Sequence, residues 1–297
     1  MVEVIVQENK PLYSARLLLT LIMGLGLVMT QMSCVGSSRF VIDSQSYQAQ
    51  GKNQRISSIV LHYTAEDEEE SIRLLTTANV SAHYLIPLTQ NNKIYQLVAD
   101  NERAWHAGSG EFAGRRVLND TSIGIEIVNE GIKKEFRKTR NSDNNGYHPS
   151  EHFVEFSDIQ VQKLAQLISS LTKKYQIEPT QIIGHSDMAP SRKIDPGAKF
   201  PWERLYKEYG IGAWYDDVDK QHFMTDGSFE TATVAEIKQL LKDYGYAIND
   251  SDKWDKASRN VVYAFQLHFR PQQIDAKMDL ETYAILKALS KKYVEAN

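Results

Sequence analysis

Several short apolar segments, separated by polar turns and helical patterns, constrain the fold of this chain more than any other feature. Residues 56–63 (ISSIVLHY) are apolar and β-branched, which is typical of a buried strand. Residues 121–128 alternate, which predicts a strand with Glu126 on one face and three isoleucines on the other. The isoleucines are Ile123, Ile125 and Ile127. Residues 181–184 form another short apolar run and predict a further strand.

More strands and helices are predicted between these segments. Residues 80–88 and 93–98 read as two strands joined by a turn. Residues 66–77 begin with acidic residues and continue as a helix, and a long helix begins at Ser157 with a capping-box pattern. Strands and helices therefore follow one another in mixed order, which predicts an α/β domain with a mixed central β-sheet flanked by helices. We expect this domain to cover residues 55–212.

The character of the sequence changes after about Trp214. Helical patterns cover residues 234–244, 256–269 and 280–293, with no strand pattern between them. A chain of 297 residues is long enough for one sizeable domain and a second, smaller one. We therefore expect a small C-terminal three-helix domain over residues 213–297.

The amino terminus differs from the rest of the chain. Residues 17–30 (LLLTLIMGLGLVMT) are apolar and uncharged. They are too short for a membrane span of roughly 20 residues and are typical of the core of a secretory signal. Cys34 follows almost at once and resembles the lipid-attachment site of bacterial lipoproteins, although Gln31 stands where such signals usually carry Leu. The alternative is an uncleaved anchor with an incidental cysteine. We expect a signal peptide over residues 1–33 and a lipidated tether over residues 34–54.

The composition narrows the range of partners. The formal net charge is -4, so the chain lacks the basic balance that is typical of nucleic-acid-binding proteins, and no nucleic-acid partner is expected. A single cysteine excludes an internal disulfide. No feature of the sequence argues for an oligomer, and we expect a monomer.

Histidines at the ends of predicted strands suggest a metal site. His62 ends one strand, His185 follows a later one, and Asp195 lies ten residues further on in a DPG loop. Two histidines and one carboxylate are a common catalytic zinc set, with a fourth position left open for water. Spacing alone leaves alternatives open, because both histidines are equally consistent with core packing and Asp195 with a turn. Asp187 is a rival ligand if the strand before it continues.

Five motifs occur in an order that resembles a known family. They are VLHYTA (60–65), VSAHYLI (80–86), AWHAG (104–108), LNDTSIGIEIVNEG (118–131) and IIGHSDMAPSRKIDPGAKFPW (182–202). Together they resemble the N-acetylmuramoyl-L-alanine amidase family, which is related to phage lysozyme-type amidases and peptidoglycan recognition proteins. The chain is most similar to members that are outer-membrane lipoproteins of Gram-negative bacteria. The resemblance covers nearly everything from Phe40 onward.

The resemblance implies a fold like that of the peptidoglycan recognition proteins and a definite activity. That activity is zinc-dependent hydrolysis of the amide bond between N-acetylmuramic acid and L-alanine in peptidoglycan, for cell-wall turnover or recycling. The resemblance implies one zinc ion per chain, with ligands at His62, His185 and Asp195. It also places a catalytic glutamate at Glu126 and a lysine beside the metal at Lys193. An exported, periplasmic protein with a lipid anchor in the outer membrane is implied as well.

Other positions carry weaker expectations. His83, His106 and Asn119 are candidate substrate contacts, each with a structural role as the alternative, and Trp105 is as consistent with the core as with a sugar platform. Four histidines have no supporting context and are expected to be surface or packing residues: His148, His152, His222 and His268. The C-terminal region resembles the three-helix peptidoglycan-binding domain through residues 261–271. It would either hold the enzyme to the wall or brace the catalytic domain.

A second hypothesis is a non-catalytic peptidoglycan-binding protein of the same fold. Some recognition proteins of this fold lack a complete metal set, whereas the three ligand candidates, Glu126 and Lys193 are all present here, which favours catalysis. A different class of zinc hydrolase is disfavoured, because the sequence contains no H-E-x-x-H segment.

Overall fold

The computed structural model describes residues 40–138 and 146–295. The predicted signal peptide and Cys34 lie outside these residues. The chain divides into two units after Lys52, and the second, Asn53–Asn297, carries every helix and strand reported below. Within the described ranges, no helix combines the length and apolar character needed to span a membrane. The boundaries expected at residues 54 and 212 stay predictions.

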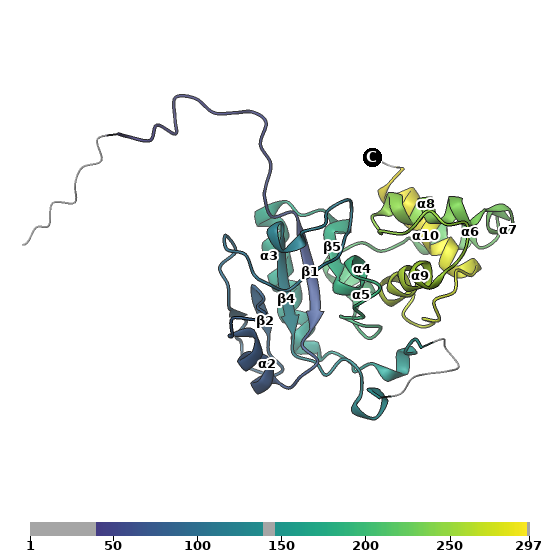
Figure 1. Cartoon of the computed structure of the whole chain (residues 1–297), viewed down its shortest axis with the longest axis horizontal. Coiled ribbons are helices and arrows are strands. Elements are labelled where there is room, and N and C mark those ends of the chain that lie inside the picture. The colour runs from purple at the N-terminus through teal and green to yellow at the C-terminus, as the bar shows by residue number, and fades with distance from the viewer. Residues whose placement is uncertain (1–39, 139–145, 296–297) are drawn as a thin grey trace, which may run out of the picture. The chain divides into compact units, whose positions relative to one another are not determined.

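A five-stranded sheet in the order β3-β2-β4-β1-β5 forms the centre of the second unit (Figure 1). Its strands are β1 (Ser58–Tyr63), β2 (Tyr84–Ile86), β3 (Tyr95–Gln96), β4 (Ser122–Ile127) and β5 (Ile182–Gly184). The pairs β1–β4, β1–β5 and β2–β4 are parallel, whereas β2–β3 is antiparallel. The predicted mixed central sheet is therefore confirmed.

The register of the two longest strands places two candidate site residues side by side. β1 and β4 pair in parallel with His62 opposite Glu126, close to the carboxyl end of each strand. β5 lies on the other side of β1 and ends at Gly184, directly before His185. The carboxyl ends of adjacent parallel strands meet at one edge of the sheet, where ligands commonly bind.

Four helices of the described chain accompany the sheet, and the first two begin with recognisable capping signals. α2 (Glu68–Leu75) begins after an Asp67 cap, and α3 (Asp158–Tyr175) begins with the predicted capping box. α4 (His185–Met188) is a single turn, and α5 (Trp202–Tyr209) follows the loop that carries Asp195. The apolar face of α3 lies in the same core as the isoleucines of β4: Leu164, Ile168 and Leu171.

Two predicted strands are shorter than expected. The segment 80–88 forms a strand only over β2, and the segment 93–98 only over β3. β3 lies at the edge of the sheet and pairs only with β2. Beyond it, the backbone N–H groups of Leu97 and Val98 both donate to the carbonyl of His83, so the ladder ends there.

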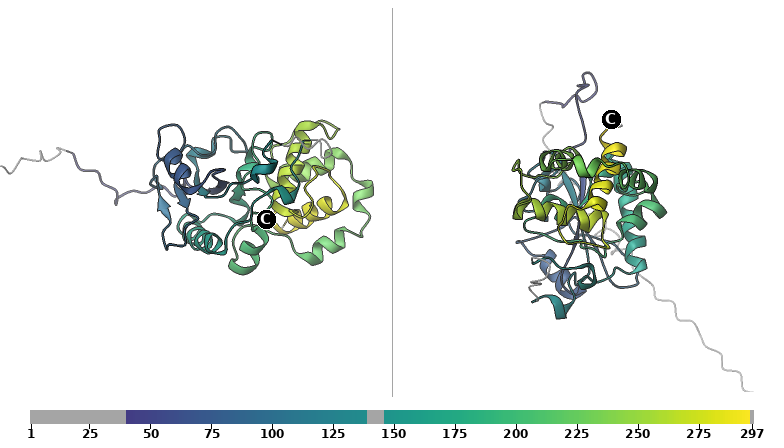
Figure 2. Two further views of the ribbon diagram at one scale, coloured as in Figure 1. Left: turned by 90° about the horizontal axis from the view of Figure 1, so that it is seen from below. Right: turned by 90° about the vertical axis from the view of Figure 1, so that its right-hand side faces the viewer.

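The C-terminal module (residues 213–295 of the described chain) is helical, as predicted. The three expected helices are α8 (Val234–Tyr244), α9 (Lys256–Phe269) and α10 (Leu280–Tyr293), grouped together in Figure 2. Two short helices, α6 (Asp217–Phe223) and α7 (Ser228–Thr231), were not expected from the sequence. Helices this short give too few turns for a periodic pattern.

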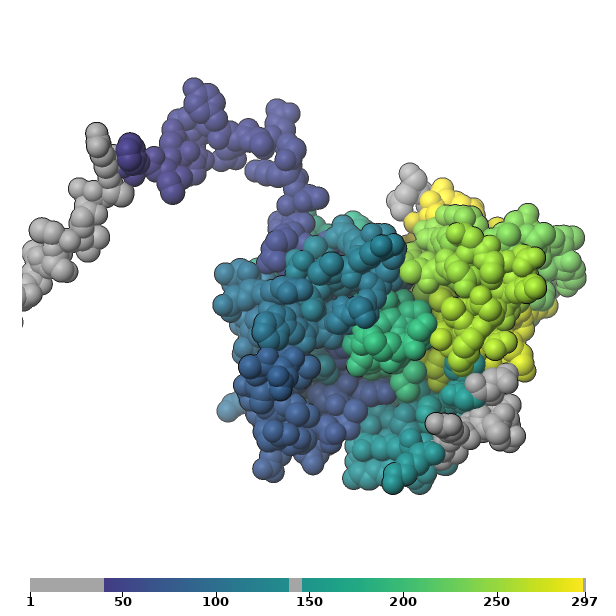
Figure 3. All heavy atoms as spheres, viewed as in Figure 1, coloured from purple at the N-terminus to yellow at the C-terminus, as the bar shows by residue number. Residues whose placement is uncertain are grey.

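The module packs directly on the sheet domain (Figure 3). One hydrophobic core runs through both, and it contains Ile125 of β4 as well as Phe265 of α9 and Ile285 of α10. A backbone hydrogen bond of 2.8 Å from Ala113 N–H to the carbonyl of Gly245 also joins the two parts. The module therefore shares its core with the sheet domain.

A substitution at Gly124 tests the packing between β4 and the ring of His106. A Cβ at this position would lie 2.3 Å from Cγ of His106, and Gly124 has no positive φ, so the effect of a substitution is purely steric. We predict that Gly124→Ala lowers the free energy of unfolding by about 1–3 kcal/mol, the usual cost of overpacking. Gly51→Ala is the control, because a Cβ at Gly51 meets nothing within 4 Å. Chemical denaturation measures both, and equal stability of the two variants would contradict this account.

Candidate active site

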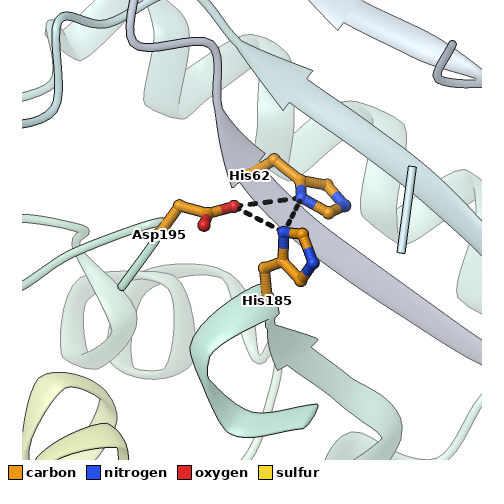
Figure 4. Close-up of side chains that lie close together, drawn as sticks. All are labelled: His62, His185 and Asp195. Atoms are coloured by element: carbon orange, nitrogen blue, oxygen red, sulfur yellow. Dashed lines mark hydrogen bonds and ion pairs between the residues drawn. The ribbon is translucent and has the colours of Figure 1, made fainter. Parts of the chain in front are cut away.

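The three ligand candidates converge on one point although they are far apart in the sequence (Figure 4). Nδ1 of His62 and Nδ1 of His185 lie 2.9 Å apart. Oδ2 of Asp195 lies 3.0 Å from each of these nitrogens. All three side chains are buried. His62 is held by β1 and His185 by the turn directly after β5, so the sheet itself brings the imidazoles together.

The tautomer of His62 follows from a chain of hydrogen bonds that ends at a carbonyl. The hydroxyl of Ser122 donates to the carbonyl of Leu118 at 2.6 Å, so its oxygen accepts from Nε2–H of His106 at 3.3 Å. Nδ1 of His106 is then an acceptor, and Nε2–H of His62 donates to it at 3.1 Å. Nδ1 of His62 therefore carries no proton and presents its lone pair.

A second carbonyl fixes the tautomer of His185. Nε2–H of His185 donates to the carbonyl of Ala107 at 2.9 Å, which leaves Nδ1 bare. The same carbonyl accepts a hydrogen bond of 2.8 Å from Arg192, a residue that the sequence analysis did not single out. Both imidazoles thus turn unprotonated nitrogens toward Asp195.

The ionisation of the cluster agrees with these assignments. Burial, together with the neighbouring His185, lowers the pKa of His62 to about 4, so its ring is neutral near pH 7. Burial and the nearby His62 lower the pKa of His106 well below its ordinary value, which keeps His106 in the neutral form that the chain of hydrogen bonds requires.

A cation suits this donor set. Three lone pairs, one of them on a carboxylate, face one another within 3.0 Å, an arrangement that is repulsive unless a positive charge lies between them. Tetrahedral zinc with bonds of about 2.0 Å separates its ligand atoms by roughly 3.3 Å, close to the spacing seen here. His62, His185 and Asp195 could therefore hold a metal ion.

Asp187 does not join this cluster. The strand β5 ends at Gly184 and α4 begins at His185, so the backbone turns before it reaches Asp187. The carboxylate of Asp187 instead accepts from the N–H of Gly184 and from Tyr246 and His268. The rival ligand considered from the sequence lies outside the metal cluster.

Glu126 and Lys193 line the same cavity as the three ligand candidates. Burial, with a further contribution from the charge of Asp195, raises the pKa of Glu126 well above its usual range. Oε2 of Glu126 is buried and has no hydrogen-bond partner among the residues that the structure describes. A buried carboxyl group with a raised pKa and a free oxygen is suited to receive and hold a proton.

The candidate substrate contacts lie at different depths. His106 lines the cavity, and its Nδ1 bonds to His62. His83 is fully buried, and its Nδ1 accepts from the N–H of Gly124. Oδ1 of Asn119 accepts from the backbone N–H groups of His106 and Ala107, so Asn119 positions the segment that carries His106.

The walls of the cavity include Trp105, which the sequence left open between core and sugar platform, and Arg192, which the sequence analysis did not single out. Trp105 is 50% exposed and lines the cavity, so it belongs to the site and not to the core. Arg192 also lines the cavity and anchors its backbone wall at Ala107 and Ser109. Arg192 stands next to Lys193 inside the longest motif, which was the available signal, but its partners lie more than 80 residues away along the chain.

Comparison with known proteins identifies the family. The family N-acetylmuramoyl-L-alanine amidase matches residues 52–198, and a peptidoglycan binding domain matches residues 230–286. N-acetylmuramoyl-L-alanine amidase AmiD of Escherichia coli (strain K12) is 38% identical over 273 residues, which span 88% of this chain and 93% of AmiD. 1,6-anhydro-N-acetylmuramyl-L-alanine amidase AmpD of Haemophilus influenzae is 40% identical over 126 residues, 42% of this chain and 56% of AmpD.

Solved structures agree with the sequence comparison. AmpDh3 from Pseudomonas aeruginosa superposes with a TM-score of 0.75 and 39% identity, covering 86% of this chain and 99% of AmpDh3. The complex of Escherichia coli AmiD with the substrate anhydro-N-acetylmuramic acid-L-Ala-D-gamma-Glu-L-Lys gives a TM-score of 0.74 and 37% identity, covering 86% of this chain and 96% of AmiD. Sequence, fold and a buried cluster that could hold a metal ion agree: this chain belongs to the N-acetylmuramoyl-L-alanine amidase family.

Proposed function

We propose that this chain is a zinc-dependent amidase that hydrolyses the bond between N-acetylmuramic acid and L-alanine in peptidoglycan, for turnover or recycling of the cell wall. One observation carries the proposal. Two bare imidazole nitrogens and one carboxylate oxygen meet within 3.0 Å in a cavity that Glu126 and Lys193 also line. Membership of the amidase family supports the same conclusion.

Zinc fits this donor set better than the other common divalent ions. Two imidazole nitrogens and one carboxylate, with one position left for water, are a frequent ligand set of catalytic zinc. Calcium and magnesium favour sites built from oxygen ligands alone. We therefore assign His62, His185 and Asp195 as ligands of one zinc ion per chain.

The side chains around the metal have complementary roles. Zinc held by His62, His185 and Asp195 would supply a Lewis acid that makes a water more acidic and polarises the scissile carbonyl. Glu126 takes a proton from the attacking water as its oxygen bonds to the carbonyl carbon, and returns a proton to the leaving nitrogen as the C–N bond breaks. The Lys193 ammonium stabilises the negative charge that develops on the carbonyl oxygen.

The substrate is a muropeptide or the polymeric wall. Two relatives have been solved with anhydro ligands, AmiD with anhydro-N-acetylmuramic acid-L-Ala-D-gamma-Glu-L-Lys and AmpDh3 with an anhydromuramic pentapeptide. We therefore propose that this chain accepts anhydro-muramic ends. The half-exposed indole of Trp105, at the wall of the cavity, offers an apolar face of the kind on which sugar rings pack.

We assign a role to each segment of the chain, beginning with the two that determine its localisation. We assign residues 1–33 as a signal peptide and residues 34–54 as a tether lipidated at Cys34, which places the enzyme in the periplasm on the outer membrane. Residues 55–212 form the catalytic domain and residues 213–297 the peptidoglycan-binding-like domain.

Digestion of purified peptidoglycan tests the function. We predict that the soluble protein releases stem peptides that begin with L-alanine, and that a chelator abolishes this release until zinc is restored. Mass spectrometry of the products, with and without the chelator, makes the measurement. Zinc binding without peptide release from wall or soluble muropeptides would favour the second hypothesis, a non-catalytic wall-binding protein.

Two substitutions within this experiment separate metal binding from proton transfer. Asp195→Ala removes a ligand and is expected to lose both zinc and activity. Glu126→Gln is expected to keep zinc but to lower kcat by about 10²–10⁴-fold, the usual share of a general base. Glu151→Gln changes an exposed carboxylate and is the matched control. A normal rate for Glu126→Gln would show that the assigned mechanism is wrong.

His106 is expected to act on the metal through His62. We predict that His106→Ala weakens zinc affinity by about 10–100-fold, because Nε2–H of His62 loses its acceptor. His106→Asn keeps an oxygen acceptor near that place and should recover part of the affinity. Chelator competition gives the zinc affinity, and steady-state kinetics gives KM. A raised KM with unchanged zinc affinity would instead indicate the substrate contact first considered for His106, a role that stays a prediction for His83 and Asn119.

The anchor is tested separately. We predict that Cys34→Ser moves the full-length protein from the membrane fraction to the soluble periplasmic fraction, because stable anchoring requires the acyl chains. Fractionation followed by immunoblotting gives the distribution, and mass spectrometry of the mature amino terminus identifies the modification. Membrane retention that is unchanged in Cys34→Ser would favour the uncleaved anchor.

A further inference from the structure

A buried carboxylate joins the metal-binding turn to the C-terminal module. Asp187 is 1% exposed and lies in α4, two residues after the ligand His185. Its Oδ2 accepts from the backbone N–H of Gly184 at 2.7 Å and from Nδ1–H of His268 at 2.8 Å. Its Oδ1 accepts from the hydroxyl of Tyr246 at 2.6 Å. Every oxygen of this carboxylate is therefore paired.

Two of the three donors belong to the C-terminal module. Tyr246 lies just after α8 and His268 lies on α9, and both are buried. The ring of His268 stacks on Trp202, with centroids 3.7 Å apart. The ring of Tyr246 meets Phe112 edge-to-face at 5.4 Å. These ring contacts fix the orientation in which Tyr246 and His268 donate to Asp187.

The turn that carries His185 needs such an anchor. α4 has only four residues, and one isolated helical turn is unstable in water. The next N–H along the turn, that of Ser186, donates to the carbonyl of Asp195 at 2.8 Å. A displacement of Asp187 would therefore move His185 and, through Ser186, the loop of the third ligand as well.

The surrounding packing transmits any such displacement. A Cβ at Gly184 would lie 2.7 Å from Cδ of Pro196 and 3.3 Å from Oδ2 of Asp187, so the start of the turn is in close contact with the ligand loop. Loss of the Tyr246 hydroxyl leaves Oδ1 of Asp187 without a donor, and loss of His268 leaves Oδ2 with only the N–H of Gly184, so the buried carboxylate is under-paired and shifts toward its remaining donors. Close-packed neighbours do not absorb this movement locally.

We propose that Tyr246 and His268 are positioning residues of the metal site: by hydrogen-bonding both oxygens of Asp187, they hold the turn that presents His185. The inference rests on the proposed zinc amidase function and adds a role for the C-terminal module. The module completes the scaffold of the metal site, whether or not it also binds the wall. His268, which the sequence suggested as a surface or packing residue, packs on Trp202 and also carries this hydrogen bond.

The test compares variants of the full-length chain that differ in one hydrogen bond. Tyr246→Phe removes only the hydroxyl, and His268→Phe keeps a ring over Trp202 but removes the donor. His268→Asn restores an N–H donor near the position of Nδ1. The control is Tyr263→Phe, because Tyr263 is a buried tyrosine of the same module whose hydroxyl donates to the carbonyl of His148, away from Asp187.

The readouts are zinc affinity by chelator competition, kcat and KM, and Tm. Tyr246→Phe and His268→Phe are expected to weaken zinc affinity by about 10–100-fold and to lower kcat with little change in KM. His268→Asn and Tyr263→Phe are expected to keep zinc affinity within a few-fold of the unsubstituted protein, whatever their effect on Tm.

Two outcomes would overturn the inference. One is an unchanged zinc affinity in both Tyr246→Phe and His268→Phe. The other is an equal loss of affinity in Tyr263→Phe, because the effect would then reflect general loosening of the module. The proposed function fails in a different way, namely if the unsubstituted protein itself binds no zinc or releases no stem peptide.

Discussion

Two imidazole nitrogens without protons and one ionised carboxylate oxygen lie within 3.0 Å of one another, and the rest of the site is arranged to keep them there. Such an arrangement is unfavourable without a cation, so it persists only if other interactions determine it. The carbonyls of Leu118 and Ala107 set the two tautomers, one through a relay over Ser122 and His106 and the other directly. Backbone oxygens, which cannot titrate, therefore decide which nitrogens face Asp195.

Support for the cluster comes from three parts of the fold. The parallel pairs of the sheet place the imidazoles at one edge. Gly124 of β4 has no side chain, which leaves room for the ring of His106. Asn119 accepts a hydrogen bond from the backbone N–H of His106 and so fixes the backbone next to that ring. The C-terminal module reaches the turn after β5 through Asp187. A metal site with so many outer contacts is rigid, which suits catalysis that depends on fixed electrostatics.

The sequence predicted those parts of the structure that depend on local patterns. The alternation over residues 121–128 indicated a strand with Glu126 opposite its isoleucines, and the apolar runs before His62 and His185 indicated the strands that bring them together. The cap signal of α3 was also visible in the sequence. Resemblance to the family, and not spacing, separated Asp195 from Asp187 as a ligand candidate.

The outer contacts could not be read from the sequence, because they join distant segments through single side chains. His106 lies 44 residues from His62, Arg192 lies 85 residues from Ala107, and His268 lies 81 residues from Asp187. No periodicity marks such pairs, and a histidine inside an amphipathic helix looks like any other packing residue. The short helices α6 and α7 escaped prediction for a related reason, since they contain too few residues to show a period.

The pairing of His62 with Glu126 across β1 and β4 has one more consequence. Side chains alternate along a strand, so a slip of one residue between these strands would turn one of the two away from the cleft. A sheet with a shifted register would place Leu61 or Tyr63 at the position that His62 takes here. Chains with a shifted register between β1 and β4 would be inactive. Every active molecule would therefore have the same spacing between His62 and Glu126.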